Sequence, residues 1–292
     1  MKAFEYHSVR TMDETCAILA ENGPDACVLA GGTDLLIELR RPGVKKPTFV
    51  VDISRIDELS GISESDGSII VGPLTTHTQL MKSNLLRQHA PLLASAASTI
   101  GSPQIRNRGT IGGNIMNAAA CADTVPALIA LGSSVTLRST RGTRRMDLVD
   151  LFVRPYQTCA RSDEVLAAIQ FPKLPRDSRG TFIKLGRRNA LSISRLSVAS
   201  VIQVESDGRI GNAIIVPGAA FPTWRRVPEA EHLLIGEKPS TKLFALAGAR
   251  VSDMMIARTG KRWSTEYKTP VLAVLVRRAL AQCVHPADTM KA

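Results

Sequence analysis

The stretch that decides the fold is IGSPQIRNRGTIGGNIMNAAACADTVPALIAL, residues 100–131. Its first part, residues 100–117, is too rich in glycine and asparagine for one regular element, so we predict a structured loop. The second part predicts a helix from Asp123 to Leu131, with Asp123 as its N-cap and Pro126 in the first turn, where proline is tolerated. A glycine-rich loop therefore lies just before the start of a helix.

A similar loop, Leu29-Ala30-Gly31-Gly32-Thr33-Asp34, lies earlier in the chain between a short apolar strand and a helix start. Free backbone N–H groups and the helix dipole attract phosphate at such a position. Gly31 and Gly32 can adopt positive φ and point successive amides inward as an anion-binding nest, and the Thr33 hydroxyl adds a donor. The later loop offers the same kinds of group, at Thr110, Gly112, Gly113 and Asn114. Two such nests suit one diphosphate held from both sides.

Each Gly-Gly pair taken alone is also typical of a tight turn, with Asn114 and Asp123 as turn or cap residues. The presence of both loops in one chain favours the ligand-binding interpretation. Neither loop is the G-x-G-x-x-G of Rossmann folds. A phosphate-binding P-loop is excluded at Gly260-Lys261, because Met255 stands where its first glycine is needed and Arg262 where serine or threonine is needed.

Hydrophobic periodicity divides the chain into three units. Residues 1–57 predict a small α/β unit, with helices at 12–21 and 34–40 and strands at 27–30 and 48–53. Residues 58–174 predict a second α/β unit, with a long helical region at 75–100 broken near Pro91 and strands at 68–72, 134–137 and 165–171. The stretch 172–180, rich in proline and charge, predicts a domain boundary. Residues 178–285 predict an α+β domain, with a hairpin of strands 197–204 and 210–216 and helices at 242–257 and 271–283.

The net charge of +11 is unevenly distributed. Residues 1–100 hold 9 Lys+Arg against 12 Asp+Glu, whereas residues 101–292 hold 28 against 14. This asymmetry indicates that the later part faces something anionic, for which a dinucleotide, an acidic partner subunit or nucleic acid would each serve. The aromatic content of 4% argues against single-stranded nucleic acid, which stacks its bases on exposed rings.

The five cysteines are scattered without C-x-x-C spacing, and the five histidines lack ligand spacing such as H-E-x-x-H. We therefore expect reduced thiols and no metal site, so that any metal would be held by another chain. The first ten residues contain Glu5, His7 and Arg10 rather than the apolar core of a signal peptide, and no window approaches the roughly 18 apolar residues of a membrane span. A cytoplasmic location is the expectation.

The chain resembles the FAD-binding subunits of the molybdenum hydroxylases, the family of xanthine dehydrogenase and carbon monoxide dehydrogenase, in three strings: AGGTDLLIEL (30–39), the stretch 100–131 and STEYKTPVLAVLVRRAL (264–280). The strings occur in the family's order over nearly the whole chain. The resemblance implies an α+β protein, with a vanillyl-alcohol-oxidase-type (PCMH-type) FAD-binding domain of two α/β subdomains and a C-terminal α+β domain. FAD is held non-covalently between the subdomains. This arrangement fits the three predicted units.

The resemblance also implies which residues bind the cofactor. On the first loop, the FAD diphosphate would be lined by Leu29, Ala30, Gly31, Gly32, Thr33, Asp34 and Leu35. On the second loop, it would be held by Thr110, Gly112, Gly113, Asn114 and Asn117. Asp123 matches an acid that hydrogen-bonds the ribose or ribityl part, with a helix cap as the other interpretation.

Further positions match groups around the ring systems of FAD. Ile100, Val165 and Leu166 match apolar positions there, although each also suits a buried core. Lys184 matches a lysine near the flavin, where a cation stabilises the reduced form, and an ordinary solvated lysine is the other interpretation. Residues 190–194 hold no aromatic side chain where some relatives have a tyrosine, and the cysteines of a branch with an extra iron–sulfur cluster are absent.

The resemblance implies an electron-transfer component of a larger complex. A molybdopterin-binding large subunit would oxidise the substrate, a ferredoxin-like small subunit with [2Fe-2S] clusters would relay electrons, and FAD in this chain would pass them on. NAD⁺ is the favoured acceptor, and a quinone, an electron carrier or dioxygen also fit. FAD needs only binding, orientation and electrostatics from the protein, so we assign no catalytic residue. Paired arginines at 187–188, 225–226 and 277–278 suit partner subunits or NAD⁺.

Two functions of other classes remain as alternatives. A free-standing FAD-dependent oxidase would use the same loops, but it would need its own acid or base at the flavin, and none is identified. A basic, non-enzymatic protein that binds nucleic acid or acts as a scaffold would explain the charge and leave both loops unexplained.

Overall fold

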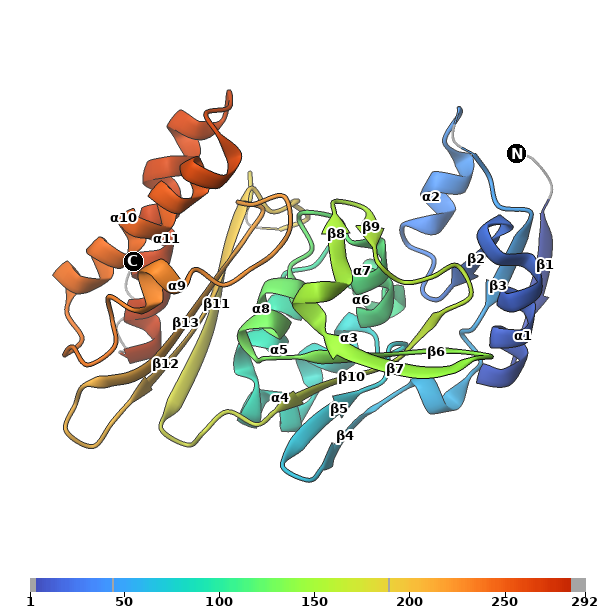
Figure 1. Ribbon diagram of the computed structural model, residues 1–292, viewed down its shortest axis with the longest axis horizontal. Helices are drawn as coiled ribbons and strands as arrows, with labels where there is room; N and C mark the ends of the chain where they lie inside the picture. Colours follow the sequence, from blue (N-terminus) through green and yellow to red (C-terminus); the bar gives the residue numbers. More distant parts are fainter. Residues whose placement is uncertain (1–3, 44, 189, 285–292) are drawn as a thin grey trace.

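The computed structural model describes residues 4–43, 45–188 and 190–284. The three larger sheets follow one another along the long axis of the molecule, and helices lie between and against them (Figure 1). The N-terminal sheet lies at one end and the C-terminal sheet toward the other, with the middle sheet between them. No helix within the described residues is long and apolar enough to span a membrane.

The N-terminal unit is a parallel sheet of order β1-β3-β2, formed by β1 (Glu5–Ser8), β3 (Phe49–Asp52) and β2 (Ala26–Leu29). Helix α1 (Met12–Asn22) begins at Thr11, whose hydroxyl accepts a hydrogen bond from the N–H of Glu14. The turn η1 (Gly23–Asp25) leads into β2, and α2 (Leu35–Arg40) follows that strand. Strand β1 was not predicted from the sequence, because its residues are mostly exposed and show no apolar alternation.

The middle unit is an antiparallel sheet of order β4-β5-β10-β6-β7. Its strands are β4 (Ile62–Ser65), β5 (Ser68–Val71), β6 (Ser134–Ser139), β7 (Gly142–Asp147) and β10 (Val165–Pro172). The unit also contains η2 (Asp57–Leu59), η3 (Leu148–Leu151), β8 (Phe152–Arg154) and β9 (Gln157–Thr158). Helices cover the sheet, and together they enclose the largest buried core of the protein.

The helical region predicted at 75–100 consists of three helices, α3 (His77–Lys82), α4 (Asn84–His89) and α5 (Pro91–Ser98). Thr76 and Ser83 cap the first two, and Pro91 occupies the first position of the third. The predicted break near Pro91 is confirmed. The break at Ser83 was missed, because a serine inside a leucine-rich run is not by itself a stop signal.

The glycine-rich segment 100–117 is not one loop, as we predicted, but two short helices, α6 (Pro103–Arg108) and α7 (Ile111–Asn117). The hydroxyls of Ser102 and Thr110 cap them. The prediction failed because glycine costs a helix only about 1 kcal/mol, which caps and packing can offset. Helix α8 (Thr124–Ala130) follows at the predicted place and is buried along its whole length.

The C-terminal unit is an antiparallel sheet of β11 (Ser178–Leu185), β12 (Leu196–Val204) and β13 (Ile210–Gly218), with α9 (Pro228–Glu231), α10 (Thr241–Thr259) and α11 (Thr265–Val284). The predicted hairpin at Asp207-Gly208 is confirmed, with Gly208 at φ +81°. Helix α11 packs on one face of the sheet and α10 packs on α11, while α5 and α8 of the middle unit contact the sheet from the other side. The sheet therefore contributes to two cores.

Candidate cofactor site

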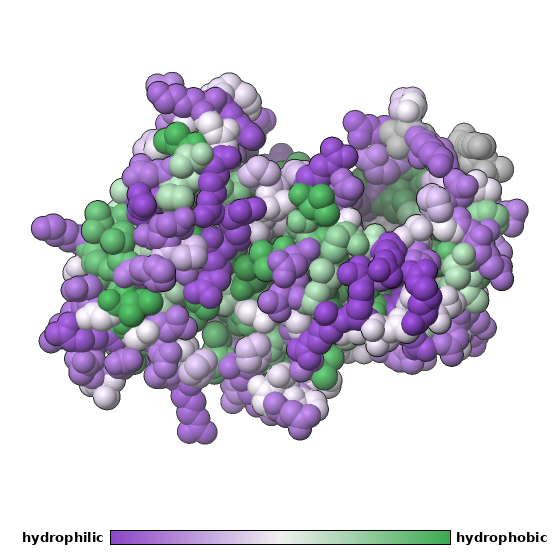
Figure 2. All heavy atoms as spheres, viewed as in Figure 1, coloured by the Kyte–Doolittle hydropathy of each residue, from purple (hydrophilic) through white to green (hydrophobic). Residues whose placement is uncertain are grey.

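A cavity of about 790 Å³ lies where the N-terminal unit, the helices of the middle unit and the C-terminal sheet meet. Figure 2 shows a hollow with apolar residues inside it between the N-terminal and middle units. Its wall includes β2 and the loop after it, helices α6 and α7, strand β10, Lys184 on β11 and the loop 191–194. Cofactor sites in proteins have volumes of about 300–1,000 Å³, so this cavity is large enough for one.

Nearly all the predicted cofactor residues line this one cavity, although they come from separate segments of the chain. These residues are Ala30, Gly31, Gly32, Thr33, Asp34, Leu35, Ile100, Thr110, Gly112, Gly113, Asn114, Asn117, Asp123, Val165, Leu166 and Lys184. Leu29 is not part of the wall. Its Cδ1 lies 3.0 Å from the place that a Cβ on Gly32 would occupy, so Leu29 supports the loop instead.

The first glycine loop presents a run of free backbone amides. Among the described residues, none accepts a hydrogen bond from the N–H of residues 31–34. Gly32 has φ +75°, as predicted for a nest. The same prediction was wrong for Gly31, which is needed for a different reason: a Cβ there would lie 2.1 Å from the carbonyl oxygen of Arg108. Glycine lets this loop touch the end of α6 while its amides stay available.

The second glycine loop is not an amide nest, and that prediction was wrong. The N–H of Ile111 donates to Thr75 O at 3.0 Å, and that of Gly112 donates to Pro73 O at 2.8 Å. The N–H of Gly113 donates to Thr110 Oγ1 at 3.1 Å. The first amides of α7 are therefore satisfied by the protein and cannot also bind an anion. Thr110 before helical residues was a cap signal that could have shown the hydrogen bond from Gly113, but not those to Thr75 and Pro73.

Side chains are what α7 offers to the cavity. Asn114 Oδ1 accepts a hydrogen bond from the Thr124 hydroxyl at 2.7 Å, which leaves the NH₂ group of Asn114 as a donor. Thr110 uses an oxygen lone pair on the cap and keeps its hydroxyl proton. Asn117 ends α7 and also lines the cavity. The second segment therefore contributes amide and hydroxyl side chains rather than backbone donors.

Asp123 and Lys184 form a nearly buried ion pair in the cavity wall. Lys184 Nζ lies 2.6 Å from Asp123 Oδ2 and donates to Thr99 O at 3.0 Å, and Ser194 donates its hydroxyl to Asp123 Oδ1. Burial raises the pKa of Asp123, while Lys184 and Ser194 oppose that rise. Asp123 stands at the N-cap position of α8 without capping it, and Lys184 is not solvated, so both simpler interpretations were wrong.

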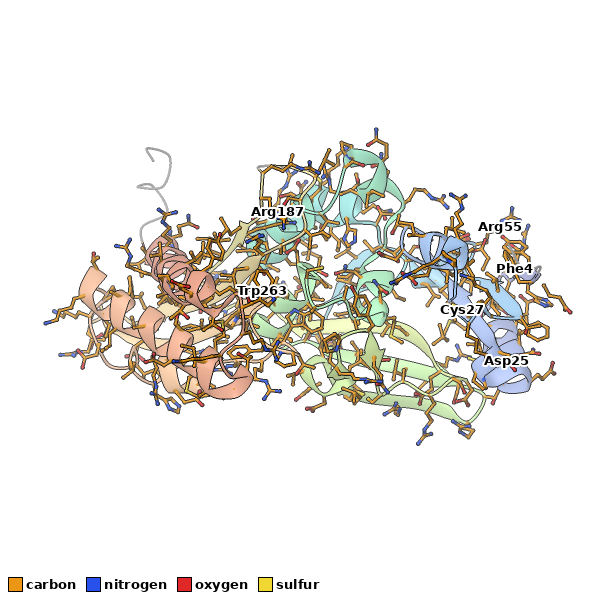
Figure 3. The ribbon with its side chains drawn as sticks, turned by 90° about the horizontal axis from the view of Figure 1, so that it is seen from above. Phe4, Asp25, Cys27, Arg55, Arg187 and Trp263 are labelled. Carbon is orange, nitrogen blue, oxygen red and sulfur yellow. The ribbon has the colours of Figure 1, made fainter. Side chains whose placement is uncertain are left out.

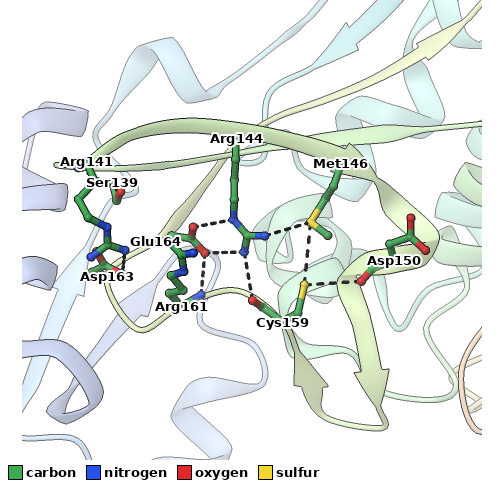
Figure 4. A network of polar contacts seen from close by, with 9 residues as sticks. All are labelled: Ser139, Arg141, Arg144, Met146, Asp150, Cys159, Arg161, Asp163 and Glu164. Atoms are coloured by element: carbon green, nitrogen blue, oxygen red, sulfur yellow. Dashed lines mark hydrogen bonds and ion pairs between the residues drawn. The ribbon is translucent and has the colours of Figure 1, made fainter.

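Two ionisable residues of the wall carried no sequence signal. His77 is buried, and burial together with the charge of Arg106 lowers its pKa to about 4. Glu164 accepts hydrogen bonds from Arg144 Nε at 2.7 Å and Nη2 at 2.8 Å, and from the N–H of Arg161 at 2.7 Å (Figure 4). The Arg144 hydrogen bonds lower the pKa of Glu164 despite its burial. Glu164 therefore stays a carboxylate beside the cavity.

The cysteines of the wall are protonated thiols at neutral pH. Cys27 lies on β2 (Figure 3) and Cys121 lies just before α8, and burial raises the pKa of both. All five cysteines are free. In the part of the chain that the structure describes, no three His, Cys, Asp or Glu side chains gather where a metal ion could be held.

Comparisons with known proteins agree with this geometry. A family model described as the FAD binding domain in molybdopterin dehydrogenase matches residues 2–174. The chain belongs to this family. A second model, described as the CO dehydrogenase flavoprotein C-terminal domain, matches residues 181–283. The predicted resemblance and the fold of an FAD-binding domain followed by a C-terminal domain are thereby confirmed.

Relatives of this family match the chain from end to end. The 6-hydroxypseudooxynicotine dehydrogenase complex subunit alpha of Paenarthrobacter nicotinovorans is 32% identical, over 99% of this chain and 97% of its own length. The xanthine dehydrogenase FAD-binding subunit of Escherichia coli O157:H7 is 31% identical, over 97% and 96%. A carbon monoxide dehydrogenase structure from Hydrogenophaga pseudoflava superposes with a TM-score of 0.90 at 29% identity and covers 97% of this chain and 98% of its own.

This membership makes the chain an FAD-binding subunit of a multi-subunit oxidoreductase, as the sequence analysis predicted. The free-standing oxidase and the basic binding protein are not favoured. The residues present also fit FAD: a glycine loop with free amides, apolar side chains and a fixed cation share one cavity. The fit depends on backbone donors from one loop only.

Proposed function

We propose that the cavity holds FAD non-covalently and that this chain passes electrons from an iron–sulfur subunit to an acceptor, with NAD⁺ as the favoured acceptor. The observation that carries the proposal is the run of free amides at residues 31–34 in the same cavity as Lys184. Bound FAD would supply the capacity to take up electrons singly or in pairs. The protein's own residues would bind FAD, orient it and set the charge around it.

Each side of the cavity has a distinct task in this proposal. The amides of residues 31–34 would bind the diphosphate, because successive N–H groups around Gly32 form an anion site. The apolar side chains of Ile100, Val165 and Leu166 would contact the ring systems. Asp123 and Thr99 O hold Lys184 in place, so that its positive charge stays at the cavity and stabilises added electrons.

Partner subunits are part of the proposal. The relatives carry names such as complex subunit alpha and medium chain, which support a heteromeric assembly. The partners would be a molybdopterin-binding large subunit and a ferredoxin-like small subunit with [2Fe-2S] clusters, in a complex that stays in the cytoplasm. Arg277 and Arg278 on α11 stay candidates for partner contacts, whereas Arg226 is held by Glu231 at 2.8 Å. Affinity purification from the native host tests this, because both partner chains should accompany the protein.

The FAD site is tested with two glycines that share one backbone feature. Gly32 and Gly208 have φ values of +75° and +81°, so alanine strains both by about 1–2 kcal/mol. Only Gly32 lies in the cavity. We expect Gly32→Ala to lower the FAD content of the purified protein and Gly208→Ala to leave it unchanged, as measured by flavin absorbance per chain. Equal content in both variants would contradict the site, and a wild-type protein that binds no FAD would contradict the function.

The acceptor is tested separately, on the assembled complex. The reduced protein is mixed rapidly with NAD⁺, a quinone or dioxygen, and the return of the oxidised flavin spectrum is followed. We expect the fastest return with NAD⁺. A faster return with either of the others would replace NAD⁺ while leaving the FAD site intact.

A further inference from the structure

His77 is a buried histidine of the cavity wall that has no role in the FAD contacts proposed above. It stands at the first position of α3, is 3% exposed and lines the cavity. Its backbone N–H donates to Gly109 O at 3.1 Å, and its Cδ2 lies 3.2 Å from the place of a Cβ on Gly109. That same place lies 3.5 Å from Thr33 Oγ1. The ring therefore sits where the first glycine loop meets the connection between α6 and α7.

The two ring nitrogens of His77 have different surroundings. Nδ1 is enclosed by protein and finds no hydrogen-bond partner among the described residues. Nε2 is not enclosed in this way, so it is the ring nitrogen left available to a ligand in the cavity that His77 lines. A proton on Nδ1 would be a buried donor without an acceptor. We therefore assign the proton of the neutral ring to Nε2, the nitrogen that is not enclosed.

The charges around His77 also keep its ring neutral. Burial and, second, the charge of Arg106 lower the pKa of His77 to about 4. The elements around the ring carry cations on α6 and at the ends of α3 and α2, and carboxylates on the first loop and α2, namely Arg106, Arg108, Lys82, Arg40, Asp34 and Glu38. Helix α5, which packs on α3, carries no charged side chain. Protonation of the neutral His77 ring would require a hydrogen-bond acceptor for Nδ1–H. It would also place a second positive charge near Arg106.

We propose that His77 is a neutral hydrogen-bond donor to the FAD diphosphate, with its Nε2–H directed at the anion that the first-loop amides bind. This inference rests on the proposed function, in which FAD occupies the cavity. A neutral donor suits the position, because it can bind an anion without placing an unpaired imidazolium in the wall before the cofactor arrives. His77 on α3 thus supplies a hydrogen-bond donor at this junction, where the amides of α7 supply none.

Dissociation constants test the contact. The variants are His77→Leu, which removes the donor, His77→Gln, which keeps an N–H group, and His232→Gln, an exposed histidine of the C-terminal unit as control. The ligands are FAD, ADP and riboflavin, of which riboflavin lacks the diphosphate. We expect His77→Leu to weaken FAD and ADP about ten- to hundredfold, as for one hydrogen bond to a charged group. His77→Gln should recover most of this, and riboflavin binding and His232→Gln should show no change.

The protonation state is tested on the wild-type protein. Nitrogen chemical shifts of ¹⁵N-histidine-labelled protein should show the Nε2–H form of His77 with and without FAD. Calorimetry at about pH 6 in two buffers should give the same proton uptake for wild type and His77→Gln. Unchanged FAD affinity in a folded His77→Leu protein, or a proton taken up by wild type alone, would overturn the proposal. Failure of the proposed function looks different, because wild-type protein would then bind neither FAD nor ADP.

Discussion

Lys184 Nζ lies 2.6 Å from Asp123 Oδ2, and the two side chains are only 11% and 5% exposed. Asp123 precedes α8 and Lys184 lies near the end of β11, so the ion pair joins the C-terminal sheet to the middle unit inside the cavity wall. Burial raises the pKa of Asp123, and Lys184 is the largest opposing influence. The carboxylate therefore needs its lysine in order to stay charged.

We expect Lys184→Met to lower the free energy of unfolding by about 3–5 kcal/mol at neutral pH, because it leaves a buried carboxylate without its cation. Without the lysine, the pKa of Asp123 rises further above its value in the unfolded chain. The folded variant then binds a proton that the unfolded chain releases, so its stability falls as the pH rises above about 4 and recovers below that value. Urea unfolding at several pH values measures this slope.

The double variant Asp123→Asn with Lys184→Met is the matched control. It removes both charges and keeps side chains of similar size in the wall. We expect it to recover most of the lost stability and to lose the added pH dependence. If the single and double variants unfold alike at every pH, packing rather than charge is responsible.

The adjacent glycines of α7 should respond differently to alanine. A Cβ on Gly112 would lie 2.5 Å from Pro73 Cβ and 2.7 Å from Pro73 O, whereas a Cβ on Gly113 would meet only Thr110 Oγ1, at 3.1 Å. We expect Gly112→Ala to cost about 1–3 kcal/mol through overpacking. Gly113→Ala should change stability by less than about 1 kcal/mol, because alanine favours the helix. Thermal unfolding of both variants measures these changes in stability, and equal losses of stability would contradict the packing explanation.

Local chemistry explains what could be predicted from the sequence. The positive φ of Gly32 and the short strand before it depend on neighbouring residues. The expectation of free amides in the first glycine loop also depended on neighbouring residues. The hairpin at Asp207-Gly208 and the break at Pro91 are local in the same sense. The resemblance then linked these local features to Lys184, which lies far away in the chain and in the same cavity.

The missed features depend on contacts between distant residues. The amides of α7 are satisfied by Pro73 and Thr75, and no pattern within residues 100–117 records those partners. His77 has an ordinary helix start as its sequence context, and its ring lies against Gly109, which is distant in the chain. Glu164, just before β10, is held by Arg144 on β7. Such pairs require the fold to be known.

Glu164→Gln tests the pair beside the cavity. Arg144 bonds both carboxylate oxygens and lowers the pKa of Glu164 below that of the unfolded chain. The pair therefore stabilises the protein above the ordinary glutamate pKa of about 4.3, and this stability is lost as the pH falls through the lower folded value. We expect Glu164→Gln to cost about 1–2 kcal/mol at neutral pH and progressively less in acid. Exposed Glu21→Gln should show no such difference in urea unfolding.

The FAD-binding domain should need the C-terminal sheet for its stability. Ala199 and Val201 of β12 belong to the core of the middle unit, whereas Val198 and Ile202 of the same strand belong to the core under α10 and α11. Because one strand serves two cores, we expect the whole chain to unfold in one transition. Far-ultraviolet circular dichroism reports all units, and the fluorescence of Trp224, which is buried in the core of the middle unit, reports that core, so their urea midpoints should coincide. A fragment of residues 1–174 leaves α5 and α8 uncovered and should bind a hydrophobic dye and unfold at lower urea. Separate midpoints, or a fragment as stable as the whole chain, would show that the shared strand does not couple the units.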